Sequence, residues 1–83
     1  MSDTYRIIYS KVINQAIKDL VGNYADDRDA AAKYLKSPAF TSHCHTAGYP
    51  SGLRDALDEM LLLSLPEQKV VAQMVMDELT ELA

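Results

Sequence analysis

Apolar side chains recur every three or four residues along most of this chain, which is the spacing that gathers them on one face of an α-helix. The first such run covers residues 4–21, and Gly22 and Asn23 then supply the backbone freedom typical of a helix end. We expect its inner face to be formed by Tyr5, Ile8, Val12, Ala16 and Leu20, flanked by Tyr9, Ile13, Ile17 and Val21.

A second, alanine-rich helix is predicted after Asp26 or Asp27, because an aspartate oxygen can accept the free amide hydrogens of a first turn. Its inner face would hold Ala31, Tyr34 and Leu35. Pro38 must end this helix, since proline disfavours a helical residue before it and lacks an N–H to donate.

A third helix can begin at the same proline, with Ser37 as its cap and Pro38 in the first helical position. Its inner stripe would be Phe40, Cys44 and Ala47, and Gly48 would close it. After a Tyr49-Pro50 corner, Ser51 is expected to cap a fourth helix. The expected inner residues of that helix are Leu53, Ala56, Leu57, Met60 and Leu61.

Ser64 and Glu67 have the spacing of a capping box, in which each side chain bonds to the other residue's backbone N–H. A fifth helix is therefore predicted over residues 65–82. It carries more apolar residues than one face requires. Its main stripe is expected to be Val70, Val71, Met74, Val75, Leu79 and Leu82, with Ala72 and Met76 beyond it.

These patterns predict an all-α fold: a compact bundle of about five short helices in a single domain of residues 1–83, with a helix-corner-helix at residues 38–63. Residues 6–9 are rich in isoleucine, but no partner strand is visible for them. Eighty-three residues can bury a single core, although chains of this size often gain stability from a partner.

Composition places the chain among ordinary globular proteins, with 48% hydrophobic and 24% charged residues. Cys44 is the only cysteine, so an internal disulfide is excluded and a reducing compartment is favoured. The first residues lack the features of a signal peptide, and no apolar run reaches the roughly 20 residues of a membrane-spanning helix. We therefore expect a cytoplasmic protein without a membrane association.

Charge is unevenly distributed between the two halves of the chain. Residues 1–42 hold six basic and five acidic residues, a net charge of +1, whereas residues 43–83 hold two basic and seven acidic residues, a net charge of −5. Such a field repels phosphate backbones and attracts basic surfaces, although a charged helix face that merely keeps the protein in solution would have the same composition.

Residues with catalytic or metal-binding chemistry are few. His43, Cys44 and His45 are adjacent, so on a helix they point about 100° apart and cannot converge on one ion without a further ligand. No separate base or oxyanion loop accompanies the cysteine. The carboxylates of the fourth helix lack the partners of a di-iron or calcium site. We therefore predict no enzymatic activity, no metal and no cofactor.

The corner at residues 48–52 raises the alternative of a helix-turn-helix DNA-binding transcriptional regulator. The helix that would enter the major groove offers Arg54, followed by Asp55, Asp58 and Glu59. Phosphate contacts provide much of the affinity for DNA, and this acidic surface repels phosphate. Nucleic-acid binding is accordingly the less favoured interpretation.

Residues 29–57 contain an aspartate-alanine segment that ends in Tyr34-Leu35, followed by S-x-x-F, C-x-x-A-G, a proline-containing corner and a leucine-arginine helix start. This order resembles small helical proteins encoded by phages and prophages, in which a D/E-A-A-x-[WY]-L segment precedes the same elements. Tyr34 stands where tryptophan is common, and the corner is one residue shorter. The resemblance implies an accessory protein of phage type, a group mostly without assigned activity. The matching residues are Asp29, Ala30, Ala31, Tyr34, Leu35, Ser37, Phe40, Cys44, Ala47, Gly48, Pro50, Leu53 and Arg54.

Together these features predict a non-enzymatic protein that binds another protein of the host or the phage, as an inhibitor of a regulator or a defence component. The surplus apolar width, the methionine content and the acidic second half motivate this hypothesis. The competing interpretation is that the same apolar residues complete the core or a homodimer seam. The candidate binding residues are Leu62, Leu63, Val70, Met74, Met76, Asp55, Asp58 and Glu59.

Overall fold

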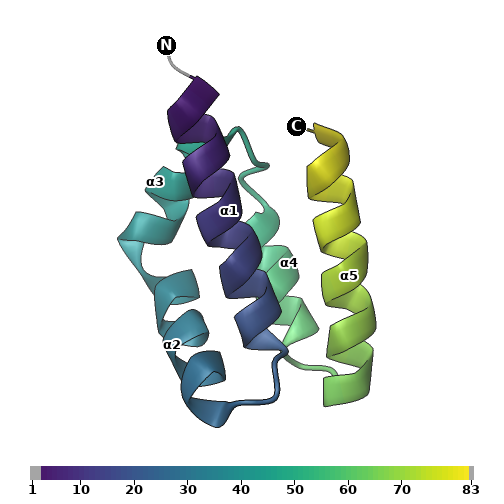
Figure 1. Cartoon of the computed structure of the whole chain (residues 1–83). Helices are drawn as coiled ribbons and strands as arrows, with labels where there is room; N and C mark the ends of the chain where they lie inside the picture. The colour runs from purple at the N-terminus through teal and green to yellow at the C-terminus, as the bar shows by residue number, and fades with distance from the viewer. Residues whose placement is uncertain (1–2, 83) are drawn as a thin grey trace.

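The computed structural model describes residues 3–82 and confirms the all-α prediction (Figure 1). Over this range it contains five helices and no strand. Residues 1, 2 and 83 of the predicted domain lie outside the described range. The helices are α1 (Asp3–Leu20), α2 (Ala25–Lys36), α3 (Pro38–Ala47), α4 (Leu53–Met60) and α5 (Leu65–Leu82).

Helix α1 organises the bundle. It packs most extensively against α3 and α2, which lie on one side of it, and less extensively against α5 on the other side (Figure 1). Helix α4 packs against α5 and completes the enclosure of the core. The start of α1 and the end of α5 lie at the same end of the molecule.

The core is entirely apolar among the described residues, and its largest fully buried side chains come from four of the helices. Burying each of them contributes about 1.5–3 kcal/mol relative to leaving it exposed. This burial fixes the mutual arrangement of α1 to α4. The six side chains are Ile13, Ile17, Leu35, Phe40, Leu57 and Met60.

The predicted inner face of α1 is partly wrong. Tyr5, Ile8 and Val12 remain 57%, 47% and 40% exposed, whereas the flanking residues Ile13 and Ile17 are completely buried. Two adjacent apolar lines run along this helix, and either could have faced the core. The packing of α2 and α3 selects the second line.

Two predicted caps are also wrong. Helix α2 begins at Ala25, before the aspartates expected to cap it, and α4 is preceded by Gly52 rather than capped by Ser51. In the first case no side chain caps the helix, and the Arg28 guanidinium donates to the Gly22 carbonyl at 2.7 Å, which ties α2 to the preceding turn. Asp26 and Asp27 lie in the first turn, where their charge still suits the helix dipole.

Ser37 separates α2 from α3 by a single residue and therefore serves both helices. It occupies the N-cap position of α3, as predicted, but its hydroxyl makes no cap bond to that helix. The hydroxyl donates instead to the Tyr34 carbonyl of α2 at 2.7 Å. The Ser37 side chain thus bonds to a carbonyl in the last turn of α2, while its backbone occupies the position before the first residue of α3.

Gly48 ends α3, as predicted, in the left-handed conformation with φ 76°. The Gly48 N–H donates to the His45 carbonyl at 3.2 Å, and the Tyr49 N–H donates to the Cys44 carbonyl at 2.9 Å. This pair of bonds is a Schellman motif. The buried side chains of Tyr49 and Cys44 provide the apolar contact that usually accompanies it.

The capping box of α5 is confirmed. The Ser64 N–H donates to the Glu67 carboxylate at 3.3 Å, and the Glu67 N–H donates to the Ser64 hydroxyl at 3.4 Å. The predicted inner stripe of this helix is partly wrong, because Val70 and Met74 face solvent. Ala72 is completely buried in their place.

Candidate functional site

An acidic surface with exposed apolar side chains covers the outer sides of α4 and α5. We call it the acidic face. Its apolar members are Leu62, Val70 and Met74, which are 86%, 62% and 60% exposed. Its seven carboxylates are all exposed and come from Asp55, Asp58, Glu59, Glu67, Asp77, Glu78 and Glu81.

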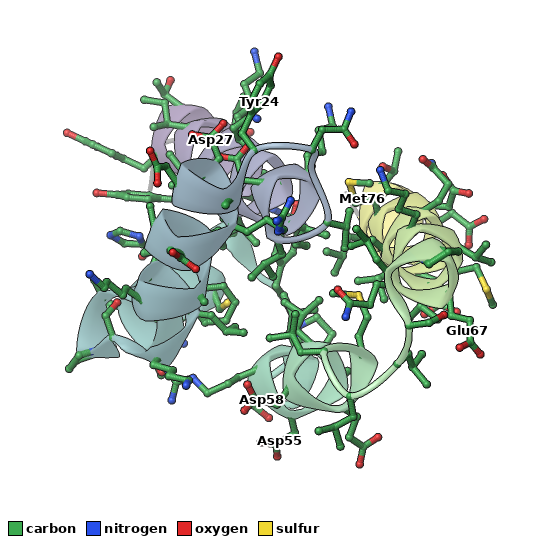
Figure 2. All side chains as sticks on the ribbon, turned by 90° about the horizontal axis from the view of Figure 1, so that it is seen from below. Tyr24, Asp27, Asp55, Asp58, Glu67 and Met76 are labelled. Atoms are coloured by element: carbon green, nitrogen blue, oxygen red, sulfur yellow. The ribbon has the colours of Figure 1, made fainter. Side chains whose placement is uncertain are left out.

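The helix geometry explains this display. Ala72 and Leu79 turn toward the core, so residues two positions from Ala72 lie about 200° around α5. Val70 and Met74 therefore lie together on the outer side of the helix. In Figure 2, Asp55 and Asp58 project from α4 away from the bundle, and Glu67 projects outward from α5.

The predicted binding residues do not all lie on this surface. Leu63 is the least exposed of the predicted apolar binding residues that face solvent, at 39%, and Met76 packs against the core. Figure 2 shows Met76 pointing from α5 toward α1. We therefore leave Met76 out of the acidic face and place Leu63 at its edge.

Backbone and side-chain hydrogen bonds hold the turn that presents Leu62. The Leu62 N–H donates to the Glu59 carbonyl and the Leu63 N–H donates to the Met60 carbonyl, both at 3.0 Å. The Gln68 side-chain amide donates to the Leu63 carbonyl at 2.9 Å and to the Leu61 carbonyl at 3.3 Å. The exposed leucine is thus carried by a braced turn.

Arg54, the residue expected to contact DNA in the helix-turn-helix alternative, is bonded to the protein instead. Its guanidinium donates to the carbonyls of Leu35 at 2.9 Å and Ser37 at 2.8 Å, and to the Thr41 hydroxyl at 2.7 Å. It also lies over the ring of Phe40, 5.7 Å from the centroid. The arginine therefore fastens α4 to the junction of α2 and α3, a role that the sequence analysis missed.

The three residues with metal-type or nucleophilic chemistry on α3 point in different directions. Cys44 is buried, as expected, and His45 is exposed. Burial raises the pKa of the Cys44 thiol, an effect that the charge of Arg54 partly opposes. Within the described range, no three His, Cys, Asp or Glu side chains are placed to hold a metal ion.

His43 belongs to an aromatic cluster that sequence reasoning did not find. Its ring stacks on Tyr9 with centroids 4.4 Å apart, and its Nδ1 lies 2.6 Å from the Tyr34 hydroxyl. Tyr34 also packs edge-on against Phe40. Burial, followed by the nearby Cys44 and Tyr9, raises the pKa of Tyr34, so this hydroxyl keeps its proton at neutral pH. The cluster joins α1, α2 and α3.

A groove of about 510 Å³ runs between α1 and α2 beside this cluster. Its floor is built from small or apolar side chains, and one charged residue lies toward each end. The first apolar line of α1, which contains Val12 and Ala16, was the only sequence signal for it. The lining residues are Lys11, Val12, Gln15, Ala16, Asp19, Ala30, Ala31 and Tyr34.

Comparisons of the chain with known protein families, with curated proteins and with solved structures found no match. Among residues 3–82, no helix combines the length and the apolar character needed to cross a bilayer.

Proposed function

We propose that this protein is a small, non-enzymatic accessory protein of phage or prophage type that binds another protein through the acidic face. The observation that carries the proposal is the exposure of Leu62, Val70 and Met74 among seven carboxylates. We further propose that binding inhibits a host or phage regulator or a defence component in the cytoplasm.

The chemistry of the acidic face defines the complementary surface. Covering its aliphatic side chains gains about 25 cal/mol for each Å² of apolar area removed from water. The carboxylates would accelerate the encounter with a positively charged protein and disfavour an acidic one. A flexible methionine can adapt to the shape of its partner. We therefore expect the partner to present an apolar patch surrounded by lysine or arginine.

The helix-turn-helix alternative has less support. Its leading base- or phosphate-contacting residue, Arg54, already donates three hydrogen bonds within the protein. The remaining outward side chains of α4 include Asp55, Asp58 and Glu59, which would repel phosphate. Duplex DNA that bound at low salt and dissociated at higher salt would revive this alternative.

A titration with a cationic amphipathic peptide tests the proposal. The probe is a fluorescein-labelled helical peptide of leucine and lysine, followed by fluorescence anisotropy. We expect binding that weakens with added salt and that becomes roughly tenfold weaker in Met74→Glu, because the substitution adds a charge to the apolar centre.

Ile7→Glu is the matched control, since it places the same charge on an exposed apolar position of α1 that belongs neither to the acidic face nor to the groove between α1 and α2. Binding to this variant should equal that of the original chain. Equal binding to Met74→Glu and the original chain, or no binding at low salt, would contradict the assignment of the acidic face.

A further inference from the structure

A second apolar surface lies on α1, in the half of the chain that is not acidic. Tyr5, Ile8 and Val12 follow one another at spacings of three and four residues and are all exposed. Tyr24, beyond the other end of the same helix, is also largely exposed. The groove between α1 and α2 continues this surface beside Val12. We call the combined area the α1–α2 face.

The charged residues of this face are ordered in a self-complementary way. Lys11 and Asp19 both line the groove and are eight residues apart, which corresponds to about 12 Å along a helix. Gln15 lies midway between them and donates a hydrogen bond to Asp19 at 3.0 Å. If two α1 helices pack antiparallel about a twofold axis at Gln15, Lys11 of each copy lies opposite Asp19 of the other.

The same axis brings the apolar ends of the face together. Ile8 then lies opposite Gly22 of the second copy, where the missing side chain leaves room for it. Tyr5 approaches the region of Tyr24 of the second copy, so the exposed aromatic residues at opposite ends of α1 cover each other. A twofold interface of this kind uses the same residues twice, as isologous dimers do.

We propose that the α1–α2 face binds a second copy of this chain and forms an antiparallel dimer through α1. Charge favours a second copy here and not on the acidic face. Residues 1–42, which include the α1–α2 face, have a net charge of only +1, whereas residues 43–83, which include the acidic face, carry −5 and would repel an identical surface. The acidic face remains available to a different, basic protein.

Sedimentation equilibrium of the full chain tests the dimer. We expect a mass that rises toward twice the 9.2 kDa of the chain between micromolar and millimolar concentrations. Lys11→Asp and Asp19→Lys should each weaken dimerisation by about tenfold, because each brings like charges together twice. The double variant Lys11→Asp/Asp19→Lys should recover the original dissociation constant to within about threefold, since it restores both pairs.

Ile8→Glu should abolish the dimer, because it places a charge in the apolar part of the interface opposite Gly22. Met74→Glu should leave the dimer intact. Circular dichroism and urea unfolding establish that each variant is folded, and if Ile8→Glu does not fold, the Lys11 and Asp19 variants test the proposal without it. A monomer at every concentration, a double variant no better than the single ones, or a dimer lost in Met74→Glu would overturn the proposal.

Discussion

The acidic face and the α1–α2 face both expose large apolar side chains, yet their surroundings differ in charge. On the acidic face, Leu62, Val70 and Met74 lie among seven carboxylates. On the α1–α2 face, Lys11 and Asp19 balance each other beside the groove. Exposed apolar area alone would make the two surfaces equivalent. Their charges distinguish a surface suited to a basic protein from one that can match a copy of itself.

The two regions also differ in how firmly they are built. Helices α1, α2 and α3 share the aromatic cluster, and they hold four of the six largest fully buried side chains. The bonds from Arg54 add to the junction of α2 and α3. Helix α5 has only Ala72 and Leu79 buried among its described side chains. The acidic face is therefore carried in part by a more weakly attached helix, which suits adaptation to a partner.

The largest expected effect on stability comes from the core formed by helices α1, α2 and α3. Phe40→Ala should lower the free energy of unfolding by about 4 kcal/mol, because it removes a buried ring that contacts Tyr34 and Arg54. Leu79→Ala on α5 should cost about 2–3 kcal/mol, since the thinner packing there can relax. Urea unfolding measures both. A greater loss in Leu79→Ala would reverse the proposed difference between the regions.

Removing the arginine bonds should have the next largest effect. Arg54→Ala leaves the carbonyls of Leu35 and Ser37 without their charged donor, so we expect a loss of about 2–3 kcal/mol in the free energy of unfolding. Arg54→Lys should recover only part of it, because lysine lacks the planar fork of donors. If Arg54→Ala were as stable as the original chain, the arginine would not fasten the helices.

A smaller effect is expected at the start of α5. Ser64→Ala removes the capping box and should cost about 1 kcal/mol, with faster amide hydrogen exchange in the first turn of the helix. Ser51→Ala is the matched control, since Ser51 does not cap α4. Its effect should stay within about 0.5 kcal/mol. Equal effects of the two substitutions would show that the box contributes nothing special.

The smallest effect is a dependence of stability on alkaline pH. Burial raises the pKa of Cys44 above its ordinary value of 9.0, so the thiol ionises in the unfolded chain at a lower pH than in the folded protein. The contribution of the buried thiol to the free energy of unfolding is complete below the ordinary pKa and is lost as pH rises through the folded-state pKa. Urea unfolding from about pH 8 to about pH 10 should show this decline, and Cys44→Ala should show less of it. An identical decline in both proteins would contradict the assignment.

Much of the fold could be predicted because its signals are local. The three-and-four spacing identified five helices, Gly48 identified the end of α3, and the Ser64–Glu67 pair identified the start of α5. The orientation of α1 and α5 could not be predicted, since each helix has two apolar lines and only its neighbours decide which one is buried. The Tyr9 and Ile13 side of α1 is chosen by contacts with α3 and the core.

The candidate site was predicted in part for the same reason. The sequence showed more apolar residues after Leu61 than one helix face requires, but the predicted inner stripe included Val70 and Met74, and these two residues are exposed together with Leu62. Periodicity could not tell that Met76 packs inward. Nor could it assign Arg54, because its acceptors Leu35 and Ser37 are 19 and 17 residues away along the chain. The sequence shows that an arginine is present, but only the fold shows which carbonyls accept its hydrogen bonds.

Amide chemical-shift mapping by NMR, during titration with the leucine-lysine peptide, shows directly whether the acidic face is the surface that binds a basic protein. We predict that the largest shifts fall on residues of α4, the Leu62 turn and the outer side of α5, and that in Met74→Glu they require about ten times more peptide. Shifts concentrated on the α1–α2 face, or shifts that require no more peptide in Met74→Glu, would contradict this assignment of the acidic face.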